Sequence, residues 1–144
     1  MNHLSPKILF AALVLGAGAF GCSSSTANTG AAAQSETFTD LYTTVLQTNC
    51  ATHHAAGAED SFLDLSTQAV AYKSLVGVKA DGPACGSSGL TRVIVGSPST
   101  SLLYEKVAES SPPCGQQMPY GGPYLSAADQ EKVYNWIADG APNN

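Results

Sequence analysis

The chain has 144 residues and a formal net charge of −5, and 44% of its residues are hydrophobic while only 12% are charged. This composition excludes a disordered chain and leaves room for one compact domain plus an additional segment. The chain has eleven acidic and six basic residues, or five basic residues without Lys7. This excess of negative charge argues against nucleic acid as a partner.

Residues 1–21 have the pattern of a signal peptide. Lys7 is followed by the apolar run ILFAALVLGAGAF, which ends in small residues before Cys22. The run is too short for a permanent membrane-spanning helix. The sequence AFGC resembles the lipobox of bacterial lipoproteins, although Ala19 stands where leucine is usual, and the resemblance implies lipidation of Cys22 and anchoring to a membrane. The alternative is a plain secretory signal that is cut after Ala19.

Residues 22–37 are mostly small and polar, so we expect them to form a flexible tether after the lipidated Cys22. The serine that follows Cys22 is typical of lipoproteins sorted to the outer membrane. The expected location is therefore outside the cytoplasm, on the outer membrane, facing either the periplasm or the cell surface.

Apolar residues take a helical period from Phe38 onward, and this stripe runs directly into Cys50. If the helix continued, Cys50 and His54 would share one face while His53 would point away from it. After this helix, Phe62, Leu63 and Leu65 are predicted to insert into the core. The stripe consists of Phe38, Leu41, Tyr42, Val45 and Leu46.

Three further helices are predicted. TQAVAYKSLVG would be capped by Ser66 or Thr67 and stop at Gly77, with Val70, Tyr72 and Leu75 inward. A third helix would begin at Ser97-Pro98, because serine can cap a helix and proline suits its first turn. The last would begin at Ser126 with Asp129 in an acidic capping box. Their other inward residues are Leu102, Leu103, Val107, Val133, Trp136 and Ile137.

Residues 38–144 are therefore predicted to form an all-α domain of about four helices joined by long loops, with one short extended piece at TRVIVG. A domain of this size has a limited core and usually needs a disulfide or a cofactor. We find no nucleophile-elbow motif, no phosphate-binding glycine loop and no paired carboxylates near an evident cleft, so we expect no enzyme activity.

The order of several short motifs resembles bacterial monohaem cytochrome c domains, particularly those carried on lipoproteins. The motifs are C-x-x-x-H after the first helix, then FLDLS, AYKSLVG, RVIVGSPSTSLLYEKV, CGQQMP and LSAADQEKVYNWIADGA. Each motif is weak alone, but their order and spacing across residues 38–142 are more specific. The family implies a haem c cofactor, single-electron transfer and a redox protein partner at the cell envelope.

By this resemblance, Cys50 would form a thioether to the haem, His54 would be the proximal iron ligand and Met118 the distal one. Ligation by histidine and methionine saturates the iron, and the neutral thioether sulfur raises its reduction potential. The chain departs from the family at His53, which stands where a second thioether cysteine is usual. At most one thioether can therefore form. Arg92 is a candidate partner for a haem propionate.

Three cysteines remain after Cys22, and two of them should pair in an oxidising compartment. A disulfide between Cys85 and Cys114 would fix the loop that carries Met118 and would leave Cys50 free for a haem vinyl group. It would close a loop of about 30 residues and contribute about 3 to 4 kcal/mol in the chain-entropy model. A disulfide between Cys50 and either of the others would abolish the thioether.

Two other functions use the same residues. Cys50, His53, His54 and Met118 are ligand types for copper, and cysteine with two histidines also suits zinc. Adjacent histidines on one helix diverge, however, which disfavours this alternative. A haem-free descendant of the fold could instead act as a structural or interaction module. That descendant would have to refill the haem cavity with side chains, and the sequence shows no extra bulk there.

Overall fold

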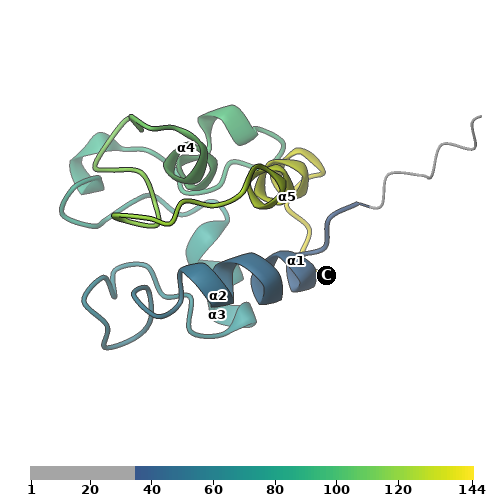
Figure 1. The fold of residues 1–144 in the computed structure, drawn as a ribbon, viewed down its shortest axis with the longest axis horizontal. Coiled ribbons are helices and arrows are strands. Elements are labelled where there is room, and N and C mark those ends of the chain that lie inside the picture. Colours follow the sequence, from purple (N-terminus) through teal and green to yellow (C-terminus); the bar gives the residue numbers. More distant parts are fainter. Residues whose placement is uncertain (1–34) are drawn as a thin grey trace, which may run out of the picture. The chain divides into compact units, whose positions relative to one another are not determined.

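The computed structural model describes residues 35–144 (Figure 1). The predicted signal peptide, Cys22 and most of the tether lie outside the described residues. Residues 35–144 are helical with almost no strand, because extended pairing there is limited to isolated bridges of Val76 with Val93 and of Lys79 with Thr91. This confirms the predicted all-α class and places the expected extended piece at residues 91–93.

The first helical segment consists of α1 (Phe38–Leu41), a π-turn (Tyr42–Leu46) and α2 (Gln47–Asn49). It begins where the side-chain oxygen of Thr37 accepts a hydrogen bond from the Asp40 amide at 3.1 Å. All five residues of the predicted stripe are buried, so this prediction is confirmed. The regular helix ends at Asn49, one residue before Cys50.

The second predicted helix is α3 (Gln68–Leu75), and Thr67 caps it by accepting the amide of Val70 at 3.3 Å. Leu75 is buried as expected and Tyr72 is partly buried, but the fully buried residue in the middle of the helix is Ala71. Val70, which was predicted to face inward, is only partly buried. The preceding loop buries Leu65 and leaves Phe62 39% exposed, so the prediction that Phe62 is a core residue was wrong.

The third helix begins later than predicted. A short 3-10 turn spans Pro98–Thr100, and α4 (Leu102–Ala108) follows with Ser101 at its N-cap. Ser101 interrupts the helix because its buried hydroxyl accepts the Ile94 amide and donates to the Ser97 carbonyl, both at 2.8 Å. Ser97 makes no side-chain capping bond. Leu102 and Val107 are buried, as predicted, and Leu103 is partly buried.

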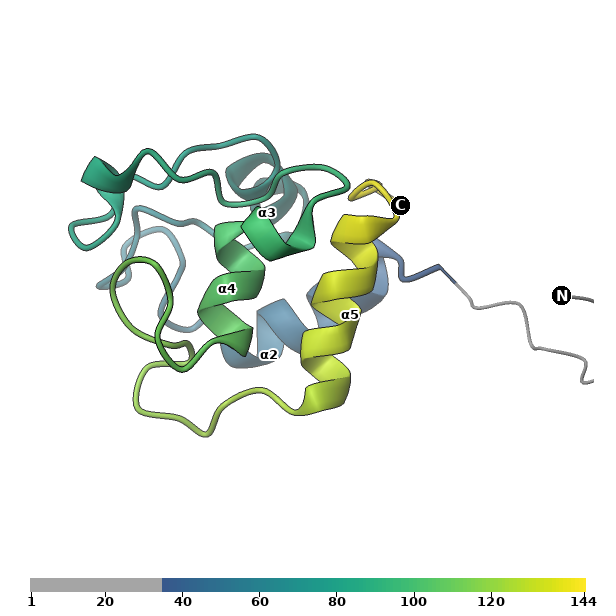
Figure 2. The same cartoon turned by 90° about the horizontal axis from the view of Figure 1, so that it is seen from above.

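The last helix is α5 (Ala127–Ala138), which packs beside α4 and contacts α1 (Figure 2). The hydroxyl of Ser126 accepts the Asp129 amide at 3.1 Å and donates to the Asp129 carboxylate at 2.7 Å. The predicted start of the helix is therefore correct, with the carboxylate bonded to the serine side chain instead of its backbone. The predicted apolar stripe of Val133, Trp136 and Ile137 is fully buried.

Contacts between aromatic rings join α1, α3 and α5. The ring of Phe38 lies 5.0 Å from that of Trp136 and 5.2 Å from that of Tyr72, measured between centroids. The polar atoms of both partners are satisfied: the Trp136 indole donates to the Pro142 carbonyl at 3.0 Å, and the Tyr72 hydroxyl donates to the Ala141 carbonyl at 2.9 Å. Trp136 and Tyr72 are thus core residues, and neither lines the cavity described next.

Candidate functional site

A cavity of about 850 Å³ lies in the described part of the chain, bounded by the turn after α2, the loops at 59–65, 80–85 and 115–123, and α4. This volume is near the upper end of the 300–1,000 Å³ typical of cofactor and small-molecule sites. Its lining includes Cys50, His54 and Met118. The three predicted haem-binding residues, which are up to 68 positions apart in the sequence, therefore face a common space.

The turn after α2 carries Cys50 and His54 to the cavity. The Cys50 carbonyl accepts the amides of His53 at 3.1 Å and His54 at 3.0 Å, so the backbone makes one more helix-like turn beyond Asn49. The Cys50 thiol is free and partly buried. Because burial disfavours the thiolate, the pKa of Cys50 is raised to about 11.

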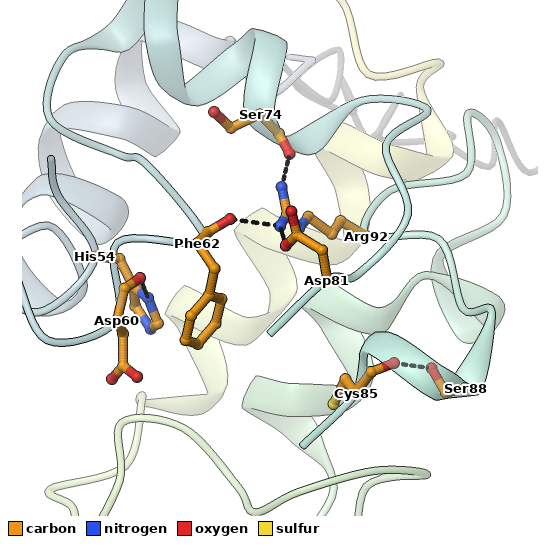
Figure 3. Close-up of polar contacts among 8 residues, drawn as sticks. All are labelled: His54, Asp60, Phe62, Ser74, Asp81, Cys85, Ser88 and Arg92. Atoms are coloured by element: carbon orange, nitrogen blue, oxygen red, sulfur yellow. Dashed lines mark hydrogen bonds and ion pairs between the residues drawn. The ribbon is translucent and has the colours of Figure 1, made fainter. Parts of the chain in front are cut away.

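The ring of His54 is held by a hydrogen bond on one side only (Figure 3). Its Nδ1 lies 3.3 Å from the Asp60 carbonyl oxygen, which can only accept, so Nδ1 carries the proton. In the neutral ring, the lone pair is then on Nε2. Metal-binding histidines typically have this second contact, which fixes the tautomer and the ring orientation. The ring also packs edge-on against Phe62, with centroids 6.2 Å apart.

The loop that carries Met118 is tied to α4 by three hydrogen bonds. The Met118 amide donates to the Lys106 carbonyl at 2.7 Å, and the Gln117 side chain donates to the Val107 carbonyl at 3.4 Å. The Lys106 ammonium donates to the Gln116 carbonyl at 3.1 Å. The loop has no regular helix or strand, so these contacts determine where it holds Met118 against the cavity.

A disulfide fixes the same loop from its other side. The sulfur atoms of Cys85 and Cys114 lie 2.05 Å apart, and the two residues are 29 positions apart in the sequence. This is the pairing that leaves Cys50 free, and Cys50 is the one free cysteine among residues 35–144. Cys85 itself lines the cavity, so the disulfide joins two segments of the cavity wall.

Arg92 holds a third part of the wall together (Figure 3). Its guanidinium is buried and donates to the carbonyls of Ser74 at 2.8 Å and Phe62 at 2.7 Å and to the carboxylate of Asp81. The sequence suggested Arg92 as a propionate partner; Arg92 lines the cavity, and three of its five N–H donors bind these protein groups. Gly82, next to Asp81, packs under the Phe62 ring so closely that a β-carbon there would overlap it.

His53 differs from its neighbour, because it is largely exposed at the cavity edge and its Nδ1 lies 2.9 Å from the Glu59 carboxylate. Among residues 35–144, no three His, Cys, Asp or Glu side chains gather into a group that could hold a metal ion. That finding gives no support to the copper or zinc alternative. A haem site would not need such a group, because the protein ligands of its iron would be one imidazole and one thioether.

The chemistry of the cavity lining fits a large, flat, mainly apolar cofactor. Apolar side chains form much of the lining, an imidazole nitrogen and a thioether sulfur are available as iron ligands, and one free thiol is present. The leucine, valine and phenylalanine residues of the lining are Phe62, Leu63, Leu65, Leu75, Leu102, Leu103 and Val107.

Lys106 lines the cavity although it was not predicted as a site residue, and the sequence contains a signal for its position. Lys106 follows Leu102 and Leu103 at helical spacing of four and three residues, so it falls on the inward stripe of α4. A lysine on the apolar face of a helix is unusual, and such a position indicates a side chain directed at a site.

No protein-family model, curated protein or solved structure shows a significant match to this chain, so the chemistry proposed below rests on its own residues. Within residues 35–144, no helix has the length and apolar character needed to cross a membrane.

Proposed function

We propose that this protein is a cytochrome c-like electron carrier that binds haem in the cavity between His54 and Met118, with a single thioether to Cys50. One observation carries the proposal: all three of these residues, and a largely apolar wall, line the same cavity of about 850 Å³. A haem iron with these ligands supplies one-electron transfer and keeps no open position for a substrate, so the protein is proposed to carry electrons without catalysing a reaction.

The protein groups have separate tasks in this proposal. The Asp60 carbonyl orients the His54 ring through Nδ1 and leaves Nε2 as the ligand atom. The disulfide and the hydrogen bonds to α4 hold the Met118 loop in place. The apolar side chains exclude water, which is one way in which a protein sets the potential of a buried redox centre.

The proposed setting is the cell envelope. We propose that the signal peptide and Cys22 place the domain on the outer membrane, where it exchanges electrons with another redox protein. The acidic balance of the chain is compatible with a basic partner. The lipid anchor is testable apart from haem, because Cys22→Ser should release the protein from the membrane fraction without changing its visible spectrum.

The test is expression of the full chain in a bacterial host that supplies haem-maturation proteins, followed by visible spectroscopy and a haem stain after denaturing electrophoresis. We expect a Soret band that survives denaturation in the wild-type protein. Cys50→Ala should keep the band in the native protein but lose the stain after denaturation. His54→Ala should lose haem, and Met118→Ala should change the band positions. His53→Ala is the matched control and should leave the spectrum unchanged.

Other outcomes have distinct meanings. A colourless, folded wild-type protein would overturn the haem proposal and favour the haem-free interaction module. A protein that binds haem but loses it on denaturation would retain the electron-transfer role and remove the thioether. A spectrum unaffected by His54→Ala would show that the proposed proximal ligand is incorrect.

A further inference from the structure

The ammonium group of Lys106 has a defined place in the cavity wall. It donates to the Gln116 carbonyl at 3.1 Å and lies beside Gly115, where a β-carbon would come within 2.5 Å of Nζ. A side chain at position 115 would therefore displace the ammonium, and the backbone φ of +62° at this residue also favours glycine. The fold thus makes room for this cation between α4 and the loop that carries Met118.

Within residues 35–144, Lys106 has no acidic partner. The ion pairs there join Arg92 to Asp81 and His53 to Glu59. An ammonium has three N–H donors, and one is used by Gln116. The bond to Gln116 is exposed, and Glu59, Asp60 and Asp81 also line the cavity, but none of them pairs with Lys106. The remaining donors of the ammonium are therefore open to water or to a ligand. Burial also lowers the pKa of Lys106.

We propose that Lys106 binds a carboxylate of the cavity ligand, which for haem is a propionate group. This inference rests on the proposed function and adds the recognition of the anionic edge of the cofactor. It follows from an ammonium without an acidic partner that lines the same cavity as the candidate iron ligands. A charge-assisted hydrogen bond here would select a free carboxylate over a neutral ester of the same shape.

The test is a titration of the haem-free full chain with haemin and with haemin dimethyl ester, in which both propionates are capped, followed by absorbance. We expect the wild-type protein to bind haemin about tenfold more tightly than the ester. Lys106→Met should bind the ester as the wild type does and lose the preference for haemin. Lys79→Met is the matched control, because Lys79 also donates to one carbonyl, that of Gly89, but does not line the cavity.

The possible outcomes separate the two proposals. Equal binding of haemin and the ester by the wild type would overturn carboxylate recognition and leave haem binding intact. Retention of the preference in Lys106→Met would do the same. Loss of affinity for both compounds in Lys106→Met, with an altered circular dichroism spectrum, would assign Lys106 a structural role and also overturn the inference. A wild-type protein that binds neither compound would overturn both proposals.

Discussion

The thiol of Cys50 is free and partly buried in the cavity wall. Its pKa of about 11 means that it stays protonated at neutral pH, so its thiolate, the reactive form, is scarce. The proposed thioether would therefore require the cofactor to be held against the sulfur, which agrees with the position of Cys50 in the cavity wall.

Alkylation by iodoacetamide should therefore be slow in the folded, haem-free protein. At pH 7 the thiolate fraction should be about a hundredfold smaller than for the ordinary thiol pKa of 9.0, and the rate should rise about tenfold per pH unit until pH 11. Mass spectrometry of timed samples measures this rate, with Cys50→Ala as the unlabelled control. Labelling as fast as in urea would contradict the burial of Cys50.

The same pKa has a consequence for stability at alkaline pH. The unfolded thiol releases its proton near pH 9.0, while the folded thiol keeps it until about pH 11. The contribution of Cys50 to the free energy of unfolding is thus fully present below pH 9 and is lost as the pH rises through 11. Cys50→Ala should remove this part of the pH dependence.

At the scale of elements, the wall of the cavity depends on one arginine that joins segments remote in the sequence. Arg92 connects the last turn of α3 with the loops that contain Phe62 and Asp81. Through Phe62 it also supports the ring that packs against His54. Its role is thus to position the wall of the cavity beside His54.

Replacement of Arg92 by Met should lower the free energy of unfolding by about 1 to 3 kcal/mol, because it leaves two partly buried carbonyls without their donor and removes the partner of the exposed Asp81 carboxylate. Urea denaturation followed by circular dichroism measures the loss. Lys73→Met is a suitable control, since Lys73 is exposed and no hydrogen bond of its side chain is seen among the described residues. Equal stability of Arg92→Met and the wild type would show that the guanidinium contacts contribute little.

The positions of helices could be predicted from the sequence where the spacing of apolar residues and the capping residue indicated the same start. The burial of Phe38, Trp136 and Ile137 could be predicted because helical spacing places them on single faces. Ser101 could not, since its inward hydroxyl bonds depend on Ile94 and Ser97 in a folded loop. The same limit applies to the site. The order of the motifs suggested Cys50, His54 and Met118. The contacts of Arg92 and Lys106 could not be predicted, because they depend on the positions of loops that a local sequence pattern does not determine.

For the molecule as a whole, the disulfide between Cys85 and Cys114 compensates for a small helical core and long loops. Reduction of this bond should lower the free energy of unfolding by about 3 to 4 kcal/mol, because the unfolded chain regains the entropy of a 29-residue loop. Guanidinium denaturation with and without a phosphine reductant tests this, in a Cys50→Ala background to prevent thiol exchange. The Cys85→Ser/Cys114→Ser variant should match the reduced protein and be insensitive to reductant.

The chain contains a single tryptophan, Trp136, which is fully buried in the aromatic cluster and does not line the cavity. Its fluorescence is therefore a built-in probe. Unfolding should move the emission to longer wavelength as the indole enters water, whereas occupation of the cavity by a strongly coloured molecule should dim the emission by energy transfer without shifting it. One optical signal can thus separate loss of the fold from uptake of a chromophore.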